Sequence, residues 1–118
     1  MIIRSVGDVI GSERDVHGPG WKSRRLILGD EGVGYSLHET TLEPGVELRF
    51  EYRNHRETVF CVECEGSVED VGSGRRVPLR PGSMYSAGVD EPHVVRTETL
   101  VKVLCVFTPA LNGTEEAD

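Results

Sequence analysis

The chain has 118 residues, which is enough for one domain with a single modest core, and we expect residues 1–118 to form that domain. A formal net charge of -7 and dispersed Lys and Arg residues argue against nucleic acid as a partner, because phosphate binding depends on clustered positive charge. No apolar run approaches the roughly 20 residues that a membrane-spanning helix needs, and Met1–Asp8 lacks the pattern of a secretory signal. We therefore expect a cytoplasmic protein without a membrane partner.

Local signals then predict one short helix followed by many short strands. Ser5 and Asp8 have the spacing of a capping box, which predicts a capped helix that continues through Ile10 to Arg14, and a loop is expected at residues 15–20. Strand-like segments follow at residues 21–28, 34–42, 46–52, 58–64, 66–71, 75–79, 93–97 and 100–108. Fourteen Gly and six Pro mark the turns between them. We predict an all-β fold, a small β-barrel or jelly roll with one or two short helices, and a mobile tail at 109–118.

Three cysteines, Cys61, Cys64 and Cys105, form an odd set, which argues against a disulfide framework in a cytoplasmic chain. Cys61 and Cys64 have C-x-x-C spacing. Residues three apart in a strand point to opposite faces, so they share neither a metal nor a disulfide unless the strand contains a bulge. We interpret both as unbridged structural residues.

Alternation along two strands predicts which side chains face the interior. In the last strand Cys105 and Phe107 share the inward face, while Lys102 marks the other face as partly wet. The same rule places Glu57 on the inner face with Val59. A carboxylate among apolar side chains must be paired or coordinated, because desolvating its charge is costly. A bound metal ion would meet that requirement.

Residues with metal-ligand chemistry lie on both sides of a Gly-rich turn. His55 and Glu57 are two residues apart on a strand and point to the same face, and the returning hairpin brings Tyr85 and His93 opposite them. Taken singly, Glu57 would be a solvated strand-edge charge and His93 a loop residue, but the set together favours a metal site in the barrel mouth. His55 is a ligand, a hydrogen-bonding support for a ligand, or a surface neighbour of Glu57, and we favour the supporting role.

Motifs along nearly the whole chain resemble those of one family. They are Ile3-Arg4-Ser5, Arg14-Asp15-Val16-His17, Trp21-Lys22-Ser23-Arg24-Arg25-Leu26, Asn54-His55-Arg56-Glu57, Glu65-Gly66-Ser67-Val68-Glu69-Asp70, Arg80-Pro81-Gly82-Ser83-Met84-Tyr85 and Cys105-Val106-Phe107. Through these motifs the chain resembles the ectoine synthase family of cupins. In that family a His-x-Glu, a Met-Tyr and a later His replace the usual cupin pattern of two closely spaced His followed by Glu.

The resemblance implies a hydro-lyase that closes N-γ-acetyl-L-2,4-diaminobutyrate to the compatible solute ectoine with loss of water. It implies Fe(2+), or Zn(2+) as a second choice, held by Glu57, Tyr85 and His93. It implies a substrate site formed by Trp21, Arg25, Thr40, Tyr52, Cys105, Phe107 and Glu115. Tyr85, Glu115 and Cys105 are the catalytic candidates. A homodimer is also expected, in which the exposed edge at Ile2-Ile3-Arg4 would be paired.

Other interpretations remain open from the residues alone. Without the resemblance, Trp21 would plug the barrel, Arg25 would pair with a surface acid and Cys105 would be a core residue. His17 and His38 are assigned to structure. The alternative functions are a non-catalytic cupin that binds a small zwitterion, and a different metal-dependent cupin enzyme, an oxygenase or isomerase.

Overall fold

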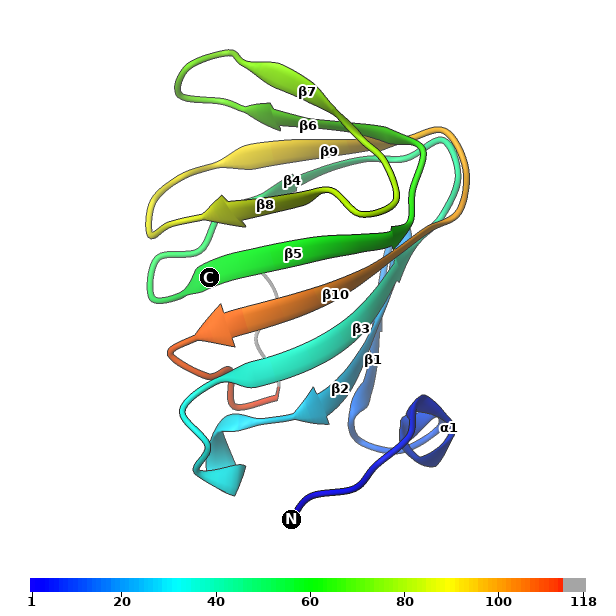
Figure 1. Ribbon diagram of the computed structural model, residues 1–118, viewed down its shortest axis with the longest axis vertical. Coiled ribbons are helices and arrows are strands. Elements are labelled where there is room, and N and C mark those ends of the chain that lie inside the picture. Colours follow the sequence, from blue (N-terminus) through cyan, green and yellow to red (C-terminus); the bar gives the residue numbers. More distant parts are fainter. Residues whose placement is uncertain (114–118) are drawn as a thin grey trace.

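The computed structural model describes residues 1–113, which form an all-β fold with a short helix near the N-terminus, as predicted (Figure 1). The elements in chain order are α1 (Val6–Val9), β1 (Asp15–Gly18), β2 (Trp21–Ile27), the 3-10 turn η1 (Gly29–Glu31), β3 (Ser36–Leu42), β4 (Glu47–Phe50), β5 (Arg56–Glu63), β6 (Gly66–Asp70), β7 (Arg76–Leu79), β8 (Met84–Ala87), β9 (His93–Thr97) and β10 (Val101–Thr108). In this part of the chain, no helix is long and apolar enough to cross a membrane.

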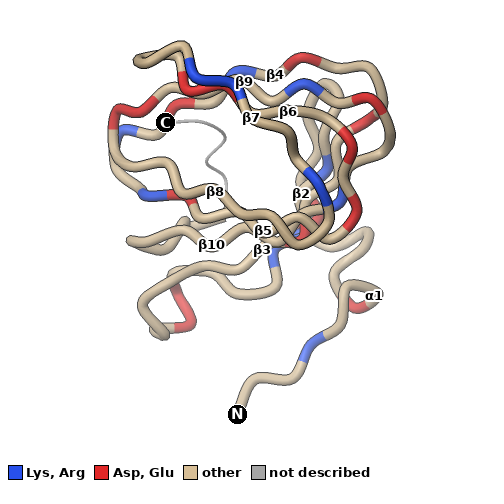
Figure 2. Tube along the Cα trace, turned by 45° about the horizontal axis from the view of Figure 1, so that its top comes forward, with Lys and Arg blue, Asp and Glu red and all other residues tan. Residues whose placement is uncertain are grey.

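Two antiparallel sheets build the barrel. One has the strand order β1-β2-β3-β10-β5-β8, and the other has the order β4-β9-β6-β7. The chain passes repeatedly from one sheet to the other, which is the connectivity of a jelly roll. Figure 2 shows the strands curving around a common interior, with positive and negative residues interspersed along the trace.

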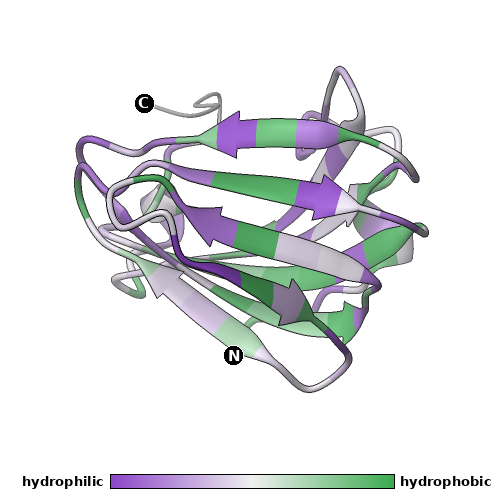
Figure 3. Ribbon diagram, turned by 90° about the horizontal axis from the view of Figure 1, so that it is seen from above, coloured by the Kyte–Doolittle hydropathy of each residue, from purple (hydrophilic) through white to green (hydrophobic). Residues whose placement is uncertain are grey.

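The inner faces follow the predicted alternation. Val101, Val103, Cys105 and Phe107 are all buried on β10, whereas Leu104 is exposed. On β5, Glu57, Val59 and Cys61 are buried as well. Figure 3 shows the resulting alternation of apolar and polar residues along the strands. The interior is therefore an apolar core into which one strand projects a carboxylate.

The N-terminal region differs from the prediction. The capping box of Ser5 and Asp8 is present, but the helix ends at Val9 rather than Arg14. Gly11 adopts a φ of 79°, a left-handed conformation that does not continue a right-handed helix. The predicted loop at 15–20 is also wrong, because residues 15–18 form β1 and pair with β2 in a hairpin.

The predicted strands are found, each within two residues of its expected ends, but β8 was missed. This strand is only four residues long and pairs with β5, where Tyr85 lies opposite Val59. Local pattern gives little signal for such a short edge strand. It matters here because it carries Tyr85 into the interior beside Glu57.

A β-bulge overturns the prediction that Cys61 and Cys64 are unbridged. In the pairing of β5 with β10, Glu63 lies opposite Lys102 while Cys61 lies opposite Val103, so Val62 is an extra residue. The two cysteines form a disulfide with a Cα–Cα distance of 5.9 Å, within the usual range. The geometric rule for a regular strand fails because the strand is irregular at this point.

Candidate active site

A cavity of about 180 Å³ lies between the two sheets. It contains every predicted substrate contact within the described residues, and it also reaches Glu57 and Tyr85. Its principal lining residues are Trp21, Ser23 and Arg25 from β2, His38 and Thr40 from β3, Cys105 and Phe107 from β10, Tyr52, and Leu111. Their proximity is observed, whereas their roles toward a substrate stay predictions.

Three adjacent strands supply most of this wall because alternate residues point inward. On β2, Trp21 and Arg25 are four residues apart and therefore share a face. Arg25 lies opposite His38 on β3, and Cys105 of β10 lies opposite His38 on the other side. The pairing register thus aligns inward residues from three separate segments into one continuous surface.

Glu57 lines this cavity and connects the two sheets through its contact with His93, which lines a neighbouring hollow together with Tyr85 and is not part of the cavity wall. The Glu57 carboxylate on β5 is 3.2 Å from Nε2 of His93 on β9, and both side chains are buried. Nδ1 of His93 donates to the carbonyl of Glu91 at 3.1 Å, which turns Nε2 toward the carboxylate. Burial disfavours the charged imidazole, but the hydrogen bond and the charge of Glu57 outweigh it and raise the pKa of His93.

Tyr85 lies beside this pair. Its ring centroid is 5.4 Å from that of His93, and the side chain is half-buried and packs against the hydrophobic core. Burial, followed by the nearby negative charge of Glu57, raises the pKa of Tyr85 well above its ordinary value. In the protein alone, the phenol is therefore a neutral group that carries a proton.

Cys105 is also a neutral group. Burial and then the charge of Glu57 raise the pKa of its thiol well above the ordinary value. The sulfur donates a weak hydrogen bond to the Thr40 hydroxyl at 3.7 Å. A reactive cysteine needs a depressed pKa, so this environment does not prepare Cys105 to act as a nucleophile.

The predicted ligands Glu57, Tyr85 and His93 have donor types that would suit a divalent transition metal. One imidazole nitrogen and two oxygen donors suit Fe(2+) or Zn(2+), and the Glu91 carbonyl orients the imidazole as a supporting partner does in metal sites. Among residues 1–113, no group of three His, Cys, Asp or Glu side chains is placed to hold a metal ion. A site here thus depends on the phenol as its third ligand.

Arg25 places positive charge at the cavity wall. It is buried, and its guanidinium donates to the carbonyl of Gly113, with Nε 3.5 Å from the Ser23 hydroxyl. Apolar rings form neighbouring parts of the wall, where Phe107 contacts Tyr52 at a centroid distance of 5.0 Å. The cavity therefore combines one buried cation with aromatic walls.

The cavity wall includes residues that the sequence analysis did not place in the site, among them His38 and Leu111. His38 is buried, lines the cavity and has Nδ1 3.3 Å from the Ser23 hydroxyl. His38 lies two residues before Thr40 on the same strand, and this spacing was the signal from which its inward orientation could have been predicted. Leu111 closes another side and is 1% exposed.

The other histidines have different environments. His17 is exposed on β1 and is 2.8 Å from Asp15, away from the cavity. His55 is buried, with Nδ1 2.7 Å from the carbonyl of Pro109. Its supporting role toward Glu57 stays a prediction. Glu115 lies outside the described residues.

Comparisons with known proteins agree with this architecture. A family model described as ectoine synthase matches residues 1–118. The chain is 44% identical over 118 residues to the L-ectoine synthase of Nocardia farcinica (strain IFM 10152), with coverage of 100% of this chain and 90% of that protein.

Solved structures extend the comparison to three dimensions. The crystal structure of ectoine synthase from P. lautus matches with a TM-score of 0.92 and 38% identity, covering 98% of this chain and 83% of that one. An RmlC-like cupin from Shewanella frigidimarina NCIMB 400 matches with a TM-score of 0.69 and 21% identity, covering 81% and 82%. The latter similarity shows the cupin fold alone.

Proposed function

Because the chain belongs to the ectoine synthase family of hydro-lyases, we propose that it closes N-γ-acetyl-L-2,4-diaminobutyrate to ectoine with loss of water. The α-amine attacks the carbon of the acetyl amide, a C–N bond forms, and the carbonyl oxygen leaves as water. The observation that carries this proposal is the family match over residues 1–118. The cavity between the sheets supplies the matching chemistry.

Arg25 is the proposed anchor for the substrate carboxylate. Its guanidinium is buried in the cavity wall, where two parallel N–H donors match the two oxygens of a carboxylate. Arg49 also lines the cavity, but its side chain is 58% exposed and lies 3.5 Å from Glu51. Arg25 is therefore better placed to hold a desolvated anion.

The cavity favours a folded substrate. Its volume of about 180 Å³ suits a small molecule, since an apolar protein cavity of roughly 150 Å³ accommodates benzene. Such confinement brings the amine and the amide carbonyl together and lowers the entropy lost on ring closure. Trp21 and Phe107 exclude bulk water, which would favour the reverse hydrolysis.

Glu57, Tyr85 and His93 are the proposed ligands of a divalent ion, Fe(2+) as the first choice and Zn(2+) as the second. When bound, such an ion polarises the oxygen of the amide carbonyl, which is otherwise a poor electrophile. The Glu91 carbonyl fixes the His93 ring, and the burial of Glu57 keeps its carboxylate away from competing water.

Proton movement completes the reaction, because the attacking nitrogen must lose a proton and the departing oxygen must gain one. Tyr85 and Glu115 are the proposed carriers. The half-buried Tyr85 lines the cavity together with Glu57, where its phenol can exchange a proton with a bound substrate. Cys105, with its neutral thiol, is proposed to contact the substrate rather than attack it.

The test is a cyclisation assay combined with metal analysis. Purified protein loaded with Fe(2+) should convert the acetylated diamine to ectoine, detected by NMR. Glu57→Ala and His93→Ala should abolish both stoichiometric metal and turnover, whereas His17→Ala should retain both because His17 is exposed outside the cavity. Full metal content in both site variants would refute the ligand assignment, and oxygen consumption without ectoine would indicate an oxygenase.

A further inference from the structure

Arg25, Ser23 and His38 form a hydrogen-bonded relay in the wall of the active-site cavity. Nε of Arg25 is 3.5 Å from the Ser23 hydroxyl, and that hydroxyl is 3.3 Å from Nδ1 of His38. All three residues line the cavity, and each is at most 5% exposed. The arginine assigned to the substrate carboxylate is thus connected to a histidine that has no role in the proposed reaction.

We propose that His38 is a positioning residue, which acts through Ser23 to orient the guanidinium of Arg25 toward the carboxylate of the substrate. This inference rests on the proposed function, in which Arg25 anchors that carboxylate. It gives His38 a role in substrate affinity, separate from proton transfer and from metal binding.

Strand pairing brings the three side chains together. Ser23 and Arg25 are two residues apart on β2 and share its inward face, and His38 of β3 lies directly opposite Arg25. The centroid of the His38 ring is 5.1 Å from that of Phe107 on β10, so the strand on the other side of β3 packs against the imidazole. Three adjacent strands therefore fix the position of the relay.

The donors that are available decide the direction of each hydrogen bond. Nε of an arginine can only donate, so the Ser23 oxygen accepts from Arg25. The single proton of this hydroxyl is then donated to Nδ1 of His38, in the tautomer that carries its ring proton on Nε2. By accepting this proton, His38 turns a lone pair of the Ser23 oxygen toward Arg25. A hydroxyl without such a partner rotates to other orientations.

An engaged Nε decides which edge of the guanidinium binds a carboxylate. Paired binding uses two adjacent N–H groups, either Nε with one terminal nitrogen or the two terminal nitrogens together. With Nε directed at Ser23, the edge formed by the terminal nitrogens is the one offered to the substrate. Both separations in the relay are at the long end for hydrogen bonds, but burial strengthens them because water competes little for the same groups.

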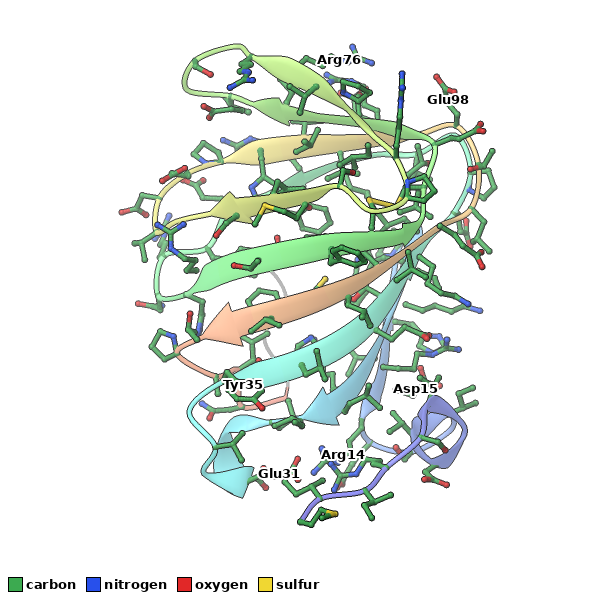
Figure 4. The ribbon with its side chains drawn as sticks, in the orientation of Figure 1. Arg14, Asp15, Glu31, Tyr35, Arg76 and Glu98 are labelled. Carbon is green, nitrogen blue, oxygen red and sulfur yellow. A yellow bond between two sulfur atoms is a disulfide. The ribbon has the colours of Figure 1, made fainter. Side chains whose placement is uncertain are left out.

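A second arginine shows how else a guanidinium can be oriented. Arg14 lies beside Glu31 outside the barrel (Figure 4), with Nη1 2.8 Å from the carboxylate. There an acid of the protein both orients the guanidinium and neutralises its charge. The contacts of Arg25 include two neutral groups, the Ser23 hydroxyl and the carbonyl of Gly113, which orient the side chain without neutralising it.

Three substitutions of His38 separate positioning from packing. In His38→Asn the amide oxygen takes the place of Nδ1 and can accept from Ser23, whereas His38→Leu has nearly the shape of Asn and cannot accept. His38→Gln carries its amide one bond further out, near the place of Nε2. In Fe(2+)-loaded protein we expect KM for cyclisation to rise about tenfold in His38→Leu and His38→Gln and to stay within about threefold of wild type in His38→Asn, with kcat changed less than about threefold throughout. Packing alone predicts the opposite order for Asn and Leu, because a buried amide is the more costly core residue.

The decarboxylated analogue of the substrate, an acetylated diaminopropane, provides a second readout in the same assay. It lacks the group that Arg25 binds, so its inhibition constant should change by less than about twofold in His38→Leu. A general distortion of the cavity would weaken the substrate and the analogue alike. Equal losses for the two compounds, or a KM of His38→Asn as high as that of His38→Leu, would overturn the proposal.

NMR of the labelled protein tests the relay without turnover, and so distinguishes failure of this inference from failure of the proposed function. We expect Nδ1 of His38 to show the nitrogen chemical shift of an unprotonated ring nitrogen. The Arg25 Nε–H signal should move in Ser23→Ala and in His38→Leu, and much less in His38→Asn. A protonated Nδ1, or an Arg25 signal that is unchanged in His38→Leu, would refute the relay even if the wild-type protein forms ectoine. The expected signals in a protein that forms no ectoine would support the relay and refute the proposed function.

Discussion

Replacement of Leu111 by Ala tests how the chain after β10 contributes to the barrel. Leu111 is 1% exposed and packs in the hydrophobic core, and it also lines the active-site cavity. Its carbonyl accepts from the Gly29 N–H at 2.8 Å, and its N–H donates to the Ser36 hydroxyl at 3.1 Å. The residue is thus held by both its side chain and its backbone.

The expected loss of stability follows from this burial. Replacement of a fully buried Leu by Ala lowers the free energy of unfolding by about 2 to 5 kcal/mol. Because Leu111 also lines an existing cavity, the space left by its side chain would be continuous with that cavity, and we expect a loss of about 2 to 3 kcal/mol. For a domain of this size, that corresponds to a fall in melting temperature of about 10 °C.

Thermal unfolding followed by circular dichroism measures this change, and steady-state cyclisation kinetics measures its effect on the site. We expect KM to rise more than kcat falls, because a wall residue is lost while the Glu57 and His93 pair is retained. Leu100→Ala is the matched control, since Leu100 is 50% exposed, and its change should stay within about 0.5 kcal/mol. A melting temperature of Leu111→Ala equal to that of Leu100→Ala would refute the packing of this segment.

Further predictions concern the substrate anchor, acid stability, the C-terminal acid and assembly. Arg25→Lys should raise KM about tenfold, measured by cyclisation kinetics, because an ammonium cannot make the paired hydrogen bonds of a guanidinium. A hydrogen bond from the Gly11 N–H holds the pKa of Asp15 at about 2. The ionised carboxylate therefore stabilises the fold above pH 4, and this stabilisation is lost as pH falls toward 2. Asp15→Asn should therefore lower the free energy of unfolding by about 1 kcal/mol at pH 7 and by nearly nothing at pH 2 in urea titrations. Glu115→Ala should reduce kcat if this residue carries a proton, and unchanged kcat would remove it from the site. Light scattering should give the mass of a dimer, and a concentration-independent monomer mass would contradict it.

Local sequence patterns were sufficient to predict the fold class and the inward faces of the strands. Glu57, Cys105 and Phe107 are buried as alternation predicts, because successive side chains of a strand point to opposite faces whatever the strand pairs with. The capping box of Ser5 and Asp8 was also predictable, since its hydrogen bonds join residues three positions apart.

Pairing between distant segments of the chain decided the features of the fold that local patterns did not predict. The disulfide of Cys61 with Cys64 depends on a bulge that exists only relative to β10, and β8 forms because its edge pairs with β5. Likewise, His38 and Leu111 enter the cavity wall through contacts with segments far away in the sequence.

In the candidate site, too, some features follow from the local sequence and others from tertiary contacts. The sequence by itself determined that Glu57 would face the interior and that His93 would begin a strand, and the resemblance assigned both as ligands of one ion. Their separation of 3.2 Å was decided by the packing of one sheet on the other. Alternation is a local property of the backbone, whereas strand register and the spacing of two sheets arise from contacts among residues tens of positions apart.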